Sequence, residues 1–135
     1  MTKEELNKII SLDKRINSKI RQLDELRQTI GNIQSIDYSK DKVQTSPSNQ
    51  IENTIIKIMD HEEKIAKDID NLIEMKEQAR KAINKVEGIY GVVLEMRYLE
   101  CMQFEEIAYR LNYSLVHIHR LHGQALNMIA NVIEW

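Results

Sequence analysis

Apolar residues recur every seven positions along one long stretch of this chain, and this repeat limits the folds open to it. The repeat consists of Ile51, Ile58, Ile65, Leu72, Ala79 and Val86. Seven-residue spacing places side chains on one face of a helix that pairs with another helix. A continuous helix here would have about 37 residues and a length of roughly 55 Å. Because such a helix cannot bury its apolar face on a small globule, the sequence predicts a second long helix beside it.

The first thirty residues supply a matching apolar face. Its members are Ile9, Ile16, Leu23 and Ile30. Thr2 followed by Glu5 is typical of a capping box at a helix start, and Gly31 predicts the helix end. The sequence thus predicts two long helices, at about 2–31 and 47–87. The pattern leaves open whether they pair within one chain, as a coiled-coil hairpin, or between two chains in a homodimer.

The helical pattern is interrupted twice. Residues 32–49 lack periodicity and are rich in serine and aspartate, which predicts a polar loop. Ser46 is expected to cap the following helix, with Pro47 in its first turn. Glu87–Gly88 then breaks the second apolar face. We therefore expect a helical domain at 1–87 and a separate domain at 88–135.

The C-terminal stretch predicts three short helices, of which the last two meet at a tight corner. The first covers about 89–99. Helical spacing puts apolar residues on one face of each of the next two, which are Phe104, Ile107, Ala108 and Leu111, then Ile118, Leu121, Ala125 and Leu126. Asn112 can adopt the left-handed conformation that ends a helix, and Ser114 can cap the next one. Two helices joined in this way predict a helix-turn-helix, whose second helix can enter the DNA major groove.

Particular sequence motifs in this stretch resemble region four of bacterial sigma factors. They are Met96-Arg97-Tyr98, Glu106-Ile107-Ala108, Leu111-Asn112-Tyr113-Ser114 and Ala125-Leu126. The pattern RYLE…FEEIA…L.YS…HRLHG.AL is similar to small sigma region four-like proteins of phages of Gram-positive bacteria, which are related to late transcription regulators of the ArpU and RinA type. The resemblance implies a sigma region four-like helix-turn-helix domain. Together with the seven-residue repeats, it leads us to expect an all-α fold: a long helical coiled-coil hairpin followed by that domain.

The resemblance also implies which side chains contact DNA. In the sigma-factor pattern, solvent-facing residues early in the last helix, about 114–131, contact bases. Carried over by position, these are Leu115, Val116, His117, His119, Arg120 and Gln124. Arginine can pair bidentately with guanine or hold a phosphate. Leu115 and Val116 depart from the usual polar residues and suit either a thymine methyl group or a protein partner. Gln103 stands where serine or threonine usually caps the helix.

Composition excludes several classes of protein and bears on the DNA-binding interpretation. The chain has no apolar run long enough to span a membrane, and its single Cys101 fits a reducing cytoplasm. Residues 88–135 contain three arginines and five glutamates. Their attraction to DNA phosphates is therefore weak, and binding to double-stranded DNA would require a further contact outside these residues. His119 and His122 share a helix face, but without a cysteine pair nearby we expect no metal. No catalytic motif or cofactor-binding motif occurs, so we expect neither an enzyme nor a cofactor.

Two classes of function follow. The first is a sequence-specific DNA-binding transcription regulator, which the resemblance identifies as a phage late-gene activator or sigma-like protein in the bacterial host cytoplasm, with bacterial RNA polymerase as a further partner. The alternative is a non-enzymatic protein-interaction module, an adaptor for RNA polymerase or a phage protein, that retains the helix-turn-helix fold. Leu115 and Val116 would then contact protein. Substitution of Arg120 discriminates between the two.

Overall fold

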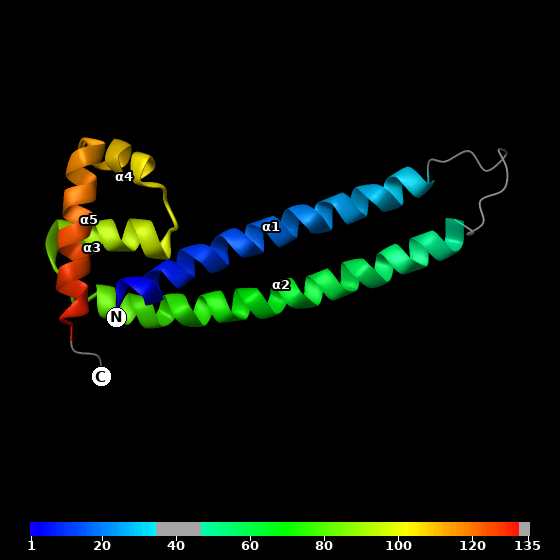
Figure 1. The fold of residues 1–135 in the computed structure, drawn as a ribbon, viewed down its shortest axis with the longest axis horizontal. Helices are drawn as coiled ribbons and strands as arrows, with labels where there is room; N and C mark the ends of the chain where they lie inside the picture. The colour runs from blue at the N-terminus through cyan, green and yellow to red at the C-terminus, as the bar shows by residue number, and fades with distance from the viewer. Residues whose placement is uncertain (35–46, 133–135) are drawn as a thin grey trace. The chain divides into compact units, whose positions relative to one another are not determined.

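The computed structural model describes residues 1–34 and 47–132, and every regular element in these ranges is a helix (Figure 1). The prediction of an all-α protein is therefore confirmed for the described residues. In chain order the elements are α1 Lys3–Gln34, α2 Pro47–Ile83, α3 Gly88–Leu94, the π-helical turn η1 Glu95–Leu99, α4 Phe104–Leu111 and α5 Leu115–Ala130. None of these helices is long and apolar enough to cross a membrane.

The residues group into two compact units. One unit is Lys14–Asp70, and the other combines Met1–Asp13 with Asn71–Trp135. Both long helices contribute to both units. The domain boundary expected between residues 87 and 88 stays a prediction.

Within Lys14–Asp70, α1 and α2 lie side by side and run antiparallel (Figure 1). Lys19 pairs with Asp68, and further along α1 the Nη2 atom of Arg27 lies 3.1 Å from Oε1 of Glu62. The residue numbers of the ion-pair partners thus decrease along α2 as they increase along α1, which is the pattern of antiparallel helices. Because an exposed ion pair such as Arg27–Glu62 contributes at most about 1 kcal/mol, apolar burial is the main source of stability here. Among the described residues of this unit, the buried apolar ones are Ile16, Leu23 and Ile65.

The second unit contains the start of α1 and the end of α2. Their buried residues are Leu6, Ile9, Ile10, Leu72, Ala79, Ala82 and Ile83. Leu6 is fully buried although it lies outside the seven-residue repeat, because it shares one side of the start of α1 with Ile9 and Ile10, three and four residues later. The side chain of Asp13 is hydrogen-bonded to Cys101, which connects α1 to the segment before α4. The first turns of α1 are therefore part of the C-terminal unit.

The last four elements enclose a single apolar core. It consists of Val93, Met102, Ile107, Ala108, Ile118 and Leu121, with partly buried residues packed around it. Val93 and Ile118 have no exposed surface, and the small Ala108 is buried where α4 meets this cluster. The apolar spacing of 104–111 and 118–125 therefore predicted correctly which faces turn inward. Phe104, Leu111 and Leu126 are only half-buried.

Several helix ends differ from those predicted. α1 continues through Gly31 to Gln34, because Gly31 does not adopt the left-handed conformation by which glycine ends helices. α2 ends at Ile83 rather than near residue 87, and backbone bonds to Ala82 and Ile83 close the turn that follows. Ser46, the expected cap of α2, lies outside the described residues.

The connection from α2 to α3 depends on two glycines. Gly88 has a φ of 68°, a left-handed conformation that suits glycine because it has no Cβ. Gly91 is buried, and a Cβ added to it would lie 2.2 Å from the carbonyl oxygen of Val86. The backbone of α3 therefore packs directly on the turn that ends α2. A break between α2 and the next helix was predicted and is present, but it begins after Ile83, ahead of the predicted Glu87–Gly88, and the close contact of Gly91 was not predicted.

The predicted helix at about 89–99 is continuous but changes its winding. After α3 it becomes the π-helical η1, in which the amide of Glu100 bonds the carbonyl of Glu95 at 3.1 Å. Cys101 then adopts a left-handed φ of 54°, and the amide of Met102 bonds the carbonyl of Met96 at 3.0 Å. These bonds satisfy the last carbonyls of the helix and redirect the chain towards α4.

Candidate nucleic-acid interface

The corner between α4 and α5 is held by capping interactions at both helix ends. Asn112 has φ 58° and ψ 39°, and the amide of Tyr113 bonds the carbonyl of Ala108 at 3.0 Å. The amide of His117 donates to the Ser114 hydroxyl at 3.1 Å. Both capping residues were predicted, and both predictions are confirmed. The first turn of α5 therefore has a defined position relative to α4.

Most of the side chains predicted to contact DNA lie on the exposed part of α5. Leu115 is 39% exposed and Val116 is 70% exposed. His119, Arg120 and Gln124 are also exposed, whereas His117 is half-buried. The two aliphatic residues are therefore not part of the core of their own unit. Their exposed surface is accessible to DNA and to a protein partner alike.

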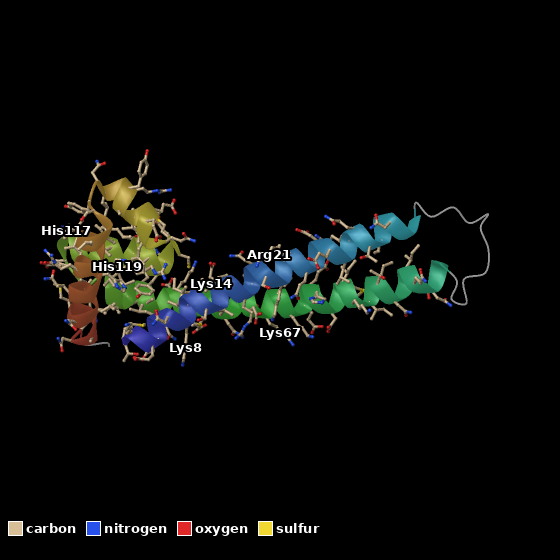
Figure 2. The ribbon with its side chains drawn as sticks, turned by 45° about the horizontal axis from the view of Figure 1, so that its top comes forward. Lys8, Lys14, Arg21, Lys67, His117 and His119 are labelled. Carbon is tan, nitrogen blue, oxygen red and sulfur yellow. The ribbon has the colours of Figure 1, made fainter. Side chains whose placement is uncertain are left out.

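Two of the histidines are oriented by aromatic neighbours, and Figure 2 shows both on α5. The ring of His117 packs edge-on against Tyr113, with 4.8 Å between ring centroids. The ring of His119 lies 4.7 Å from that of Phe104, the first residue of α4. These contacts limit the rotamers of both side chains. Each histidine therefore presents its nitrogens from a restricted set of positions.

His122 has a structural role that sequence reasoning missed. Its Nε2 lies 2.7 Å from the hydroxyl of Tyr98, which is 1% exposed, and its ring packs edge-on against Phe104. Burial lowers the pKa of His122 from 6.5 to about 4, and the positive charges of Arg97 and Lys3 act in the same direction. The imidazole is thus neutral near pH 7 and accepts the Tyr98 proton when its own proton is on Nδ1.

This burial predicts a pH-dependent stability. An unfolded His122 takes up a proton near pH 6.5, whereas the folded protein resists protonation down to about pH 4, so acid favours the unfolded state. The free energy of unfolding should be fully retained above pH 6.5 and should decrease as the pH falls towards 4. Urea denaturation at several pH values measures it. His122→Gln keeps a hydrogen-bond acceptor for Tyr98 and should reduce the pH dependence of the free energy of unfolding. If that free energy falls as steeply with acid in the variant as in the wild type, His122 is not the cause of the dependence.

Of the arginines in the last four elements, Arg97 makes its contacts with other residues of the protein. Its Nη1 donates to the carbonyl of Met102 at 2.8 Å, and its guanidinium carbon lies 4.3 Å from the Phe104 ring centroid. Arg110 is exposed but pairs with Glu106 at 3.0 Å. Arg120 is exposed and forms no ion pair with any described residue. Arg120 is therefore the arginine best placed to meet a phosphate or a base.

The surface around the corner carries aromatic side chains that the sequence argument did not select. Tyr109 is 82% exposed and Tyr113 is 41% exposed. Asn127 is also exposed and lies seven residues after Arg120, on the same face of α5. That spacing was visible in the sequence and could have identified Asn127.

Over residues 1–34 and 47–132, no group of three or more His, Cys, Asp or Glu side chains could hold a metal ion.

Comparison with known proteins gives one match. Residues 32–130 match the family described as "Protein of unknown function (DUF1492)". No curated protein and no solved structure matches the chain. The matched range extends from the last turn of α1 to the end of α5, so the α4–α5 corner lies within it.

Proposed function

The chain belongs to the DUF1492 family, and we propose that it is a sequence-specific DNA-binding transcription regulator. The single observation that carries this proposal is the capped corner between α4 and α5, which presents Arg120 on the outer surface of α5 without an ion-pair partner among residues 1–34 and 47–132. In this proposal α4 and α5 form a helix-turn-helix, and α5 occupies the major groove. Leu115, Val116, His117, His119, Arg120 and Gln124 are the proposed contacts.

The dimensions and capping of α5 support a role in the groove. α5 spans Leu115–Ala130, 16 residues, and a helix with its side chains is about 10–12 Å wide, close to the roughly 12 Å of the major groove. The capping bond from the His117 amide to Ser114 leaves the first turn well defined. A contact to a base requires such a defined position, since arginine discriminates guanine through two hydrogen bonds at once.

The scarcity of unpaired arginines near α5 makes a second anchor part of the proposal. DNA affinity comes largely from phosphates neutralised by lysine and arginine, yet Arg97 and Arg110 are engaged within the protein. We propose that the α1–α2 pair is a coiled coil that sets the geometry of a homodimer or contacts bacterial RNA polymerase. Two linked binding sites can raise apparent affinity by roughly 10² to 10⁴. A phage late-gene activator or sigma-like protein acting in the bacterial cytoplasm would fit such an arrangement.

One observation favours the second candidate function, a non-enzymatic adaptor that binds protein through the same corner. Val116 and Tyr109 are 70% and 82% exposed, and large exposed apolar side chains are a feature of protein-binding surfaces. RNA polymerase or a phage protein would then be the partner. The two candidates differ in what a charge reversal at Arg120 does.

We expect Arg120→Glu to weaken binding to a selected duplex by about 100-fold or more. Losing a bidentate contact costs about 1–3 kcal/mol, and the new carboxylate also repels phosphate. The measurement is fluorescence anisotropy with a duplex that the wild-type protein selects from a random pool, titrated with salt. Arg21→Glu on α1 changes net charge equally and is also exposed, so it serves as the matched control.

Each result separates the candidates. Loss of binding in Arg120→Glu with a small effect of Arg21→Glu supports the regulator. Undetectable binding of the wild-type protein even at about 50 mM salt, where phosphate contacts are strong, would contradict DNA binding and favour the adaptor. RNA polymerase subunits would then be the first partners to test.

A further inference from the structure

Gly123 lies in the middle of α5, where glycine is the least favourable residue apart from proline. Its φ is not in the left-handed region, and a Cβ added to it would meet no atom within 4 Å. It therefore differs from Gly88, whose φ is 68°, and from Gly91, which contacts the backbone of Val86. Neither backbone conformation nor packing among the described residues requires a glycine at position 123.

The position of Gly123 on α5 indicates what it faces. The buried residues of the helix are Ile118, Leu121, Ala125 and Ile129. Steps of three and four residues place Val116, Arg120, Gly123 and Asn127 together on the opposite side, and all four are exposed. We call these four residues the outer face of α5. Gly123 lies near its centre, so the helix backbone there is covered by no side chain.

The chemistry of the outer face distinguishes DNA from a protein helix as the occupant. No aspartate or glutamate occurs from Ile107 to Val132, although the chain contains 21. The outer face carries a cation, an amide and only one apolar side chain, Val116. A helix packed against it would need an apolar stripe to bury, and that stripe is lacking. A polyanion with hydrogen-bonding base edges suits this surface better.

We propose that Gly123 lets a DNA duplex approach the backbone of α5 more closely than any side chain would allow. This inference rests on the proposed DNA-binding function and specifies the depth at which α5 sits. A helix about 10–12 Å wide nearly fills a groove of about 12 Å. A methyl group at the centre of the outer face would displace the helix outward and lengthen the bonds made by Arg120 and Asn127. Glycine at this position therefore lowers helix stability and improves contact with DNA.

The test is Gly123→Ala in the full-length chain, which should change stability and binding in opposite directions. Alanine is the better helix former and meets no neighbouring atom, so Tm should rise by roughly 3–6 °C. Affinity for the duplex selected by the wild-type protein should fall at least about tenfold at matched salt. Gly123→Leu should bind more weakly still, because its side chain is longer.

Gly31→Ala is the matched control. Gly31 also lies within a helix and is exposed, and a Cβ added to it would likewise meet no atom within 4 Å. The substitution should raise Tm in the same way and leave DNA affinity unchanged. Affinity that is equal in Gly123→Ala and wild type would overturn the inference, while loss of binding in Arg120→Glu would still support the proposed function.

Three other outcomes would also overturn the inference. A decrease of Tm in Gly123→Ala would mean that the fold itself needs this glycine. Loss of self-association in sedimentation, with unchanged DNA affinity, would assign the outer face to a second copy of the chain. Absence of DNA binding by the wild-type protein would remove the proposed function together with the inference.

Discussion

Gly91→Ala should destabilise the fold of this protein strongly. An added Cβ would lie 2.2 Å from the carbonyl oxygen of Val86 and 3.3 Å from its carbonyl carbon, and both are backbone atoms that no rotamer change can move. The turn that carries Val86 is itself closed by a 2.9 Å bond from the Val86 amide to the carbonyl of Ile83. α3 would have to separate from the end of α2. We expect a cost of about 3 kcal/mol or more, at the upper end for overpacked sites.

The other glycines provide graded controls for urea denaturation followed by circular dichroism. Gly88→Ala should cost about 1 kcal/mol, because Gly88 has a φ of 68° but free space around it. Gly31→Ala should be stabilising. The expected order of stability is therefore Gly31→Ala, wild type, Gly88→Ala and Gly91→Ala. If Gly91→Ala unfolds at the wild-type urea concentration, α3 does not pack on the turn as described.

Ile118→Ala should be the most damaging substitution within α5. Ile118 has no exposed surface and belongs to the cluster that joins α3, α4 and α5. Truncating a buried isoleucine removes apolar contacts and leaves a cavity, at a cost of about 2–5 kcal/mol. DNA binding should weaken as well, because the same packing orients the outer face of α5. The midpoint of urea unfolding and the affinity for the selected duplex measure the two effects.

Val116→Ala is the matched control for Ile118→Ala, since it truncates another β-branched residue two positions earlier on the same helix. Val116 is 70% exposed, so its truncation should change stability by no more than about 0.5 kcal/mol. Any loss of DNA affinity in Val116→Ala would then reflect a lost contact rather than partial unfolding. Equal destabilisation by the two substitutions would contradict the assignment of the inner and outer faces of α5.

Local sequence patterns were sufficient to predict much of the helical structure. Apolar spacing identified Ile107, Ile118 and Ala125 as inward-facing, because a helix repeats its faces every three to four residues. Asn112 and Ser114 marked the corner correctly, since their capping bonds involve only neighbours in the chain. Gly31 was misread as a helix end because glycine permits the left-handed conformation without requiring it.

The roles of other residues depended on contacts between helices. Tyr98 and His122 are far apart in the sequence, and only the crossing of η1 and α5 brings them within 2.7 Å. Arg97 is one of the three arginines of residues 88–135, and nothing in the sequence indicated its bond to the Met102 carbonyl or its position over the Phe104 ring. No periodicity encodes such pairings, because they depend on the angle and distance at which two helices cross.

The sequence by itself thus determined the all-α class, the inward faces of the helices and the α4–α5 corner, all of which follow from interactions within a few residues. Only the tertiary structure decided that burial disfavours protonation of His122, that Arg97 bonds within the protein, and that Gly91 contacts another backbone whereas Gly123 does not. A side chain at Gly91 would collide with the backbone of Val86, whereas a Cβ at Gly123 would meet no described atom within 4 Å. That difference exists only once the helices are packed, because it concerns what lies opposite each residue.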